Sequence, residues 1–147
     1  MGSNVAVVAL ATGLLLAGCG TTAGTHPAPT AGLAGAEWVV ADIVGRGVVD
    51  DSQVTLMFGD DGRLSGSASC NRLIGKYVAE GTTLRISDAG LTMMACPPAL
   101  MDQEQRLVEV LNAVDTYRID ETGTLVLSTH SGATVTARRG TATSSDL

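Results

Sequence analysis

Short segments of alternating apolar and polar residues, separated by turn residues, recur between Glu37 and Arg139. Alternation places every second side chain on one face of a strand, and Gly and Asp accept the backbone angles of tight turns. Many short strands at regular spacing favour an antiparallel sheet curled into a barrel or half-barrel. The predicted strands are Glu37–Gly45, Ser52–Gly59, Arg63–Cys70, Leu73–Glu80, Thr83–Ser87, Leu91–Cys96, Thr116–Glu121, Thr124–Thr129 and Thr134–Arg139.

One segment has a different period. Apolar residues recur at helical spacing from Leu100 to Val114, directly after a Pro-Pro pair, and predict an amphipathic helix over about Ala99–Val114. We expect Asp102 and Glu104 to lie at the positive end of its dipole. The predicted fold class is therefore mainly β (α+β), a small antiparallel β-barrel-like sheet with one amphipathic helix.

The first 36 residues contain no Asp, Glu, Lys or Arg. Within them, the apolar run Val5–Ala17 is too short to cross a membrane, which takes about 20 residues, and it suits an export signal. The run leads into "LAGC", which resembles the bacterial lipobox, where the chain is cut before the cysteine and the cysteine carries fatty acyl chains such as palmitate. We predict that lipid on Cys19 anchors the protein to the extracytoplasmic side of the cell membrane. An unlipidated secretory signal and a chance cysteine are the alternatives, and "MGSNVAV" lacks the Lys or Arg usual before such a run.

This interpretation divides the chain into four parts. Residues 1–18 form a signal peptide, and residues 19–35 are the lipidated cysteine with a flexible tether rich in Gly, Ala, Thr and Pro. Residues 36–139 form the folded domain, and residues 140–147 form a disordered tail. The net charge of −6 and the scattered arginines leave no phosphate-binding footprint, so we expect no nucleic-acid partner. We expect a monomer.

The folded part holds two cysteines, Cys70 and Cys96. An even pair in an exported protein favours a disulfide bond, with two buried free thiols or a nucleophilic Cys70 as the alternatives. A nucleophile needs a base, and His130, the histidine of this part, lies in a predicted hairpin turn. The spacings of common zinc and calcium sites are absent from the sequence. We therefore predict no catalytic residue, no metal site and no cofactor.

The order of motifs along the domain resembles the META domain, the HslJ-like family of heat-shock proteins. The resemblance runs from about Glu37 to Arg139, and "CNRLIGKY" and "LTMMAC" are its most specific parts. The matching positions are Trp38, Phe58, Asp61, Gly62, Arg63, Gly66, Cys70, Asn71, Gly75, Tyr77, Thr92, Met94, Cys96 and Glu104. The resemblance implies a small β-barrel-like domain with one helix, often found in bacterial envelope lipoproteins. It implies no established catalytic residue, cofactor or ligand. It does imply an association with stress response and antibiotic tolerance.

Two positions depart from the family pattern. Ser69 replaces a glycine, so we expect an unstrained backbone there, and Leu107 replaces an aromatic residue. Among the family positions, Asn71 is expected to satisfy backbone groups at a bend and Tyr77 to pack on the next strand. Gly66 is expected to let its strand curve tightly.

Three functions fit the sequence. The first is a non-enzymatic, lipid-anchored envelope protein that binds an envelope protein or a small apolar ligand, or supports the envelope under stress. The second is a thiol-redox or other enzyme that uses Cys70 and Cys96. The third is an accessory or inhibitor module that presses a strand edge onto an envelope enzyme.

Overall fold

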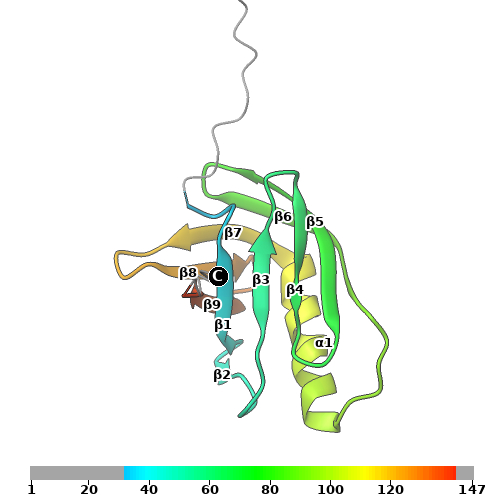
Figure 1. Ribbon diagram of the computed structural model, residues 1–147. Helices are drawn as coiled ribbons and strands as arrows, with labels where there is room; N and C mark the ends of the chain where they lie inside the picture. Colours follow the sequence, from blue (N-terminus) through cyan, green and yellow to red (C-terminus); the bar gives the residue numbers. More distant parts are fainter. Residues whose placement is uncertain (1–31, 142–147) are drawn as a thin grey trace, which may run out of the picture.

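Residues 32–141, which the computed structural model describes, form a closed antiparallel barrel of eight strands with one helix at its side (Figure 1). The strands are β1 (Glu37–Ile43), β2 (Arg46–Gly47), β3 (Thr55–Phe58), β4 (Arg63–Ser67), β5 (Arg72–Glu80), β6 (Thr83–Leu91), β7 (Val114–Ile119), β8 (Thr124–Thr129) and β9 (Thr134–Arg139), and the helix is α1 (Pro98–Ala113). From β3 onward each strand pairs with the next, and β1 pairs with both β3 and β9, which closes the barrel. The predicted fold class is confirmed.

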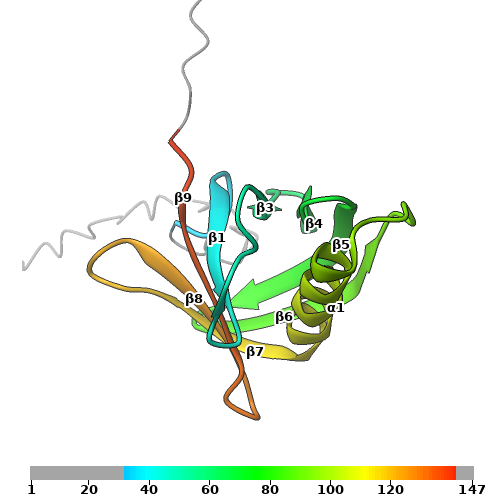
Figure 2. The same ribbon diagram turned by 90° about the horizontal axis from the view of Figure 1, so that it is seen from below.

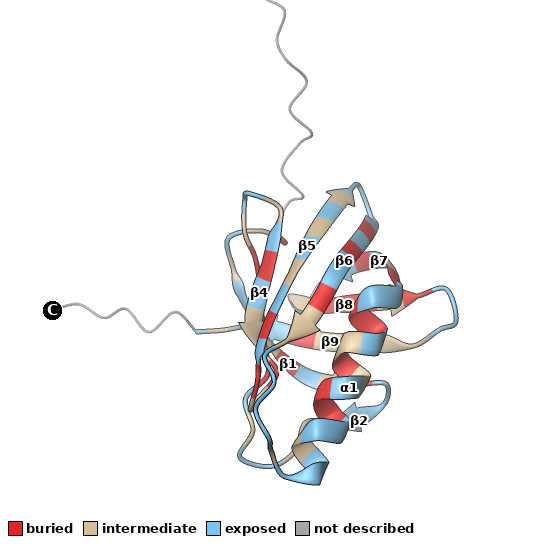
Figure 3. Ribbon diagram, turned by 90° about the vertical axis from the view of Figure 1, so that its right-hand side faces the viewer, coloured by how far each residue is buried: buried red, intermediate tan, exposed pale blue. Residues whose placement is uncertain are grey.

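The core fills the inside of the barrel with aliphatic side chains around Trp38 and Phe58, both fully buried. Buried residues alternate with exposed ones over the first half of β6, and β4 has one buried residue between exposed neighbours, as expected for strands with one face in the core (Figure 3). Few aromatic residues are available, so leucine side chains supply most of the remaining large buried volume. Burial of one such side chain contributes about 1.5–3 kcal/mol.

The seam between β6 and β7 is short, and α1 packs against β6 next to it. The two strands share one paired position, Thr83 with Thr116, and Figure 2 shows α1 lying beside β6 and leading into β7. The side-chain amide of Asn112 donates to the Ala89 carbonyl (3.1 Å) and accepts from the Ala89 N–H (3.2 Å). This amide therefore bonds the β6 backbone much as a neighbouring strand would.

The prediction for Leu91–Cys96 was wrong beyond its first residue. β6 continues to Leu91, and residues 92–97, here called the 92–97 segment, have no regular secondary structure. The alternating pattern gave a wrong prediction here because the main chain of this segment is bonded largely by the side chain of Asn71 and not by a neighbouring strand. The helix after it begins and ends one residue earlier than predicted.

The packed part of the chain starts a few residues before the boundary predicted at residue 36. Leu33 is fully buried in the core, and its carbonyl accepts a 3.0 Å hydrogen bond from Trp38 Nε1. The predicted signal peptide, Cys19 and most of the tether lie outside the described residues, as do residues 142–147 of the predicted tail.

Candidate functional site

Cys70 and Cys96 form a disulfide bond, as the cysteine count predicted. Cys70 lies in the turn between β4 and β5, and Cys96 lies in the 92–97 segment, 26 residues later. Their Cα atoms are 6.3 Å apart, within the usual range for a bridge. Neither sulfur is a free thiol in this state. The bridge joins the β4–β5 turn to the segment that leads into α1.

Asn71, beside the bridge, binds the 92–97 segment through both ends of its amide. Its Oδ1 accepts from the Met94 N–H (2.7 Å) and the Thr92 hydroxyl (3.0 Å), and its Nδ2 donates to the Met94 carbonyl (3.3 Å). The Thr92 hydroxyl in turn accepts from the Arg72 N–H (2.9 Å). The expectation that Asn71 satisfies backbone groups is correct, and three family positions meet at this amide.

Glu104 of α1 completes the cluster from the opposite side. Its Oε1 accepts from the N–H groups of Cys70 (3.0 Å) and Asn71 (2.6 Å), and its Oε2 accepts from Asn71 Nδ2 (2.8 Å). The residue is 3% exposed, so these three donors take the place of the water that an exposed carboxylate would bind. The residues Cys70, Asn71, Thr92, Met94, Cys96 and Glu104 together are called the Asn71 clamp below.

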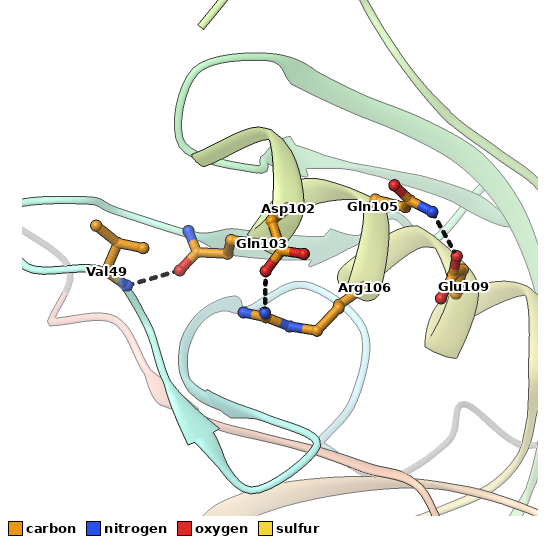
Figure 4. Close-up of polar contacts among 6 residues, drawn as sticks. All are labelled: Val49, Asp102, Gln103, Gln105, Arg106 and Glu109. Atoms are coloured by element: carbon orange, nitrogen blue, oxygen red, sulfur yellow. Dashed lines mark hydrogen bonds and ion pairs between the residues drawn. The ribbon is translucent and has the colours of Figure 1, made fainter. Parts of the chain in front are cut away.

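The expected dipole role of the helix acids was therefore wrong. The first turn of α1 contains no acidic residue, because the helix begins at Pro98 and places Asp102 and Glu104 in the second turn. Asp102 forms an ion pair with Arg106, Gln105 donates to Glu109 (2.9 Å), and Gln103 accepts from the Val49 N–H (2.6 Å) (Figure 4). Gln103 and Glu104 both belong to the buried face of the helix. Their spacing from Leu107 was the signal that could have revealed this.

Ser69 departs from its expectation as well. Its φ is +109°, in a region that side-chain-bearing residues rarely adopt, so the position is strained although the sequence suggested that it is not. The turn must reverse direction between β4 and Cys70 while it presents two N–H groups to Glu104. A glycine would adopt this conformation at lower cost.

Tyr77 and Gly75 lie on β5, outside the clamp. The ring of Tyr77 meets Phe58 of β3 edge-on with centroids 5.0 Å apart, and the expected packing on the next strand stays a prediction. Burial, followed by the charges of Asp60 and Asp61, raises the pKa of Tyr77 above its usual 10.0. The neutral phenol donates to the Gly59 carbonyl (2.8 Å). Gly75 faces an irregularity in β6, and a Cβ there would lie 3.2 Å from Ala89 Cα.

An open groove of about 810 Å³ lies between α1 and residues 91–95. Its apolar lining includes Leu91, Met93, Met94, Pro98, Met101 and Val108. Met93, Met94 and Met101 are 98%, 61% and 50% exposed, which is unusual for large apolar side chains. The Asn71 clamp fixes one wall, because it bonds Met94 and bridges Cys96. We call this feature the methionine groove.

Other candidate chemistry is sparse in the described part of the chain. His130 is exposed in the turn between β8 and β9, as predicted. Within residues 32–141, no group of three or more His, Cys, Asp or Glu side chains is arranged to hold a metal ion. Over the same range, no helix combines the length and apolar composition needed to span a membrane.

The model of the META domain family matches residues 31–141, which is more than half of the chain. The chain belongs to the META domain family. No curated protein matches it. The Asn71 clamp is therefore built largely from the residues on which the resemblance rested.

Solved structures of other proteins have a similar fold. A protein from Burkholderia xenovorans, solved by NMR, is 26% identical over 79% of this chain and 89% of its own, with a TM-score of 0.63. A second NMR structure is 26% identical over 70% of this chain and 87% of its own, with a TM-score of 0.54. A crystal structure of a DUF4847 family protein from Bacteroides vulgatus, 17% identical over 71% and 92% with a TM-score of 0.52, shares the fold.

Proposed function

We propose that this META domain protein is a lipid-anchored, non-enzymatic binding protein on the extracytoplasmic side of a bacterial membrane. Cys19 carries the anchor, and the methionine groove is the binding site. The family is associated with stress response and antibiotic tolerance, and in this proposal the binding contributes to such a role.

The observation that carries the proposal is a set of apolar side chains held exposed by a rigid support. A loose loop could fold its methionines inward, but the 92–97 segment is tied by the bridge at Cys96 and by two main-chain hydrogen bonds at Met94. Unbranched, polarisable methionine side chains adapt to partners of varied shape. The polar groups of the Asn71 clamp are used in hydrogen bonds that hold the 92–97 segment in place. This arrangement favours binding over catalysis.

The redox-enzyme alternative gains less support from the same residues. Asn71 and Glu104 bond the main chain on both sides of the bridge, so they hold the two cysteines together independently of their oxidation state. The accessory-module alternative, in which a strand edge is pressed onto an envelope enzyme, uses a different surface from the groove and stays a prediction.

Native mass spectrometry of the protein purified from the membranes of its host tests both parts of the proposal. We expect a chain that begins at Cys19, carries acyl groups and lacks two hydrogens because of the bridge. We also expect a retained partner or ligand that Met93→Gln/Met101→Gln loses and Met57→Gln keeps, since Met57 is 43% exposed but lies on β3, outside the groove.

Two results would contradict the proposal separately. An unmodified Cys19, with Cys19→Ala still found in membranes, would remove the anchor. Identical bound species on the wild type and on the double variant would remove the groove.

A further inference from the structure

The backbone of the 92–97 segment has an unusual pattern of hydrogen bonding. Asn71 bonds both the N–H and the carbonyl of Met94, as a residue on a neighbouring strand would. Met93 and Ala95 are exposed, and their main-chain groups have no hydrogen-bond partner among residues 32–141. Asn71 therefore uses the main-chain groups of Met94, and those of Met93 and Ala95 stay available to another partner.

Main-chain groups beside an apolar groove suit one class of ligand. An extended peptide pairs with such groups and places alternate side chains in the adjoining groove. An acyl chain fills apolar space but offers nothing to these donors and acceptors. This pattern therefore favours a peptide over a lipid.

The charges around the groove indicate the composition of that peptide. The charged residues in its lining are Asp102, Glu104 and Glu109, all acidic. Glu104 is used by the clamp, and Asp102 pairs with Arg106, which is not part of the lining. Glu109 is bonded only by the neutral amide of Gln105 among the described residues. With a net charge of −6 on the whole chain, basic side chains are attracted and anionic lipid headgroups repelled.

We propose that the methionine groove binds an extended segment of a partner protein that carries apolar side chains and Lys or Arg. The segment pairs with the main chain of Met93 and Ala95, its apolar side chains contact Met93 and Met101, and a basic side chain lies near Glu109. This inference rests on the proposed function, because it takes the groove as the binding site.

Selection of displayed random 12-residue peptides against the full chain tests the inference. We expect enriched peptides with at least two net positive charges and several apolar residues. Their affinity should fall at least tenfold with Met93→Gln/Met101→Gln and severalfold with Glu109→Lys. Met57→Gln and Glu121→Lys are matched controls, since both replace exposed residues outside the groove and should change the affinity less than twofold. The groove residues changed are exposed, so these variants should fold.

Amide hydrogen exchange separates strand pairing from side-chain contact alone. With an enriched peptide bound, exchange at Met93 and Ala95 should slow at least tenfold, and the methyl NMR signals of Met93, Met94 and Met101 should shift while that of Met57 does not.

Each other outcome overturns the inference in a distinguishable way. Enrichment of neutral or acidic peptides, or equal affinity for the methionine double variant, overturns it while binding at the groove can stand. Failure to enrich any peptide, together with a lipid in the native mass spectrum that the double variant loses, replaces the peptide with a lipid. If no peptide is enriched, and the native mass spectrum also shows no bound species that the double variant loses, the proposed function is overturned as well.

Discussion

The two sides of the barrel are held together by different means. Around β1, β8 and β9, strands pair along most of their length and close the barrel through main-chain hydrogen bonds. On the other side β6 and β7 share a single paired position, and the disulfide bond with the side chains of Asn71, Glu104 and Asn112 joins α1 to the sheet. We call these the paired side and the clamped side.

The difference matters for binding, because the methionine groove lies on the clamped side alone. Where side chains rather than a neighbouring strand bond the main chain, some main-chain groups and apolar side chains nearby stay exposed. Where strands pair continuously, few such groups stay exposed. The clamped side is joined by a small number of side-chain hydrogen bonds, such as the one from the Cys70 N–H to Glu104, so its stability depends on few groups. Substitutions should therefore act on the two sides through different mechanisms.

The largest effect is expected where two neighbouring strands approach most closely. A Cβ on Gly66 would lie 2.0 Å from the Thr55 carbonyl oxygen of the paired strand β3, a contact that only main-chain movement relieves. Gly66→Ala should lower the free energy of unfolding by on the order of 4 kcal/mol, beyond the usual range for overpacking. Denaturant unfolding measures this.

Gly47→Ala is the matched control for that substitution. The nearest atom to a Cβ at Gly47 is the Ala41 carbonyl oxygen at 3.9 Å, an ordinary contact, so the change should be within about 0.5 kcal/mol. Equal stability of Gly66→Ala and Gly47→Ala would show that β3 and β4 separate more easily than a continuous ladder allows.

On the clamped side, the disulfide bond should have the next largest effect. It closes a loop of 26 residues, for which the loop-closure relation gives about 3.5 kcal/mol. Cys70→Ala/Cys96→Ala should lose about this much stability in guanidinium unfolding, and a reductant should destabilise the wild type but not the variant. Unchanged stability of the variant would mean that hydrogen bonds alone hold the clamp.

Local patterns predicted most of the paired side. Alternation located β7, β8 and β9 to within about two residues, because each hairpin is specified by neighbours in sequence. Counting cysteines predicted the bridge, and helical spacing predicted α1. The burial of Glu104 was missed because a carboxylate is exposed by default, and its three donors come from a turn more than 30 residues away.

The remaining failures also belong to the clamped side. The φ of Ser69 depends on the path that the turn takes toward Glu104, which no local pattern records. The exposure of Met93 contradicts the expectation for a large apolar residue. Its position follows from the tie at Met94, so it reflects a long-range contact rather than local preference.

Glu104→Gln should reduce stability by about 2 kcal/mol. The amide retains an oxygen for the N–H groups of Cys70 and Asn71 but places a donor against Asn71 Nδ2, which leaves a buried donor unsatisfied. Glu109→Gln, an exposed acid on the same helix, should change stability by less than about 0.5 kcal/mol. Similar losses in the two variants would rule out a specific role for the Glu104 carboxylate.

Ser69→Gly should instead increase stability, by roughly 0.5–1 kcal/mol. Relief of the positive φ exceeds the entropy that a glycine loses on folding. The control is Ser65→Gly on β4, where the backbone is an ordinary strand and the same exchange should cost about 0.5–1 kcal/mol. The two serines lie four positions apart, so opposite signs would locate the strain in the turn of the clamp.

The smallest effect concerns a hairpin turn of the paired side. Hydrogen bonds to Asp120 from the Thr122 hydroxyl, then from the Thr124 N–H, lower the pKa of this carboxyl below its usual 3.8. Because the folded-state pKa lies below the unfolded one, the carboxylate stabilises the fold above pH 3.8, and this contribution disappears as pH falls through the folded pKa. The melting temperature of Asp120→Asn should therefore lie slightly below that of the wild type at pH 6, and the difference should shrink as the pH is lowered below 3.8. A difference in melting temperature that does not change with pH would indicate that Asp120 stabilises the turn through its backbone conformation and not through the charge of its carboxylate.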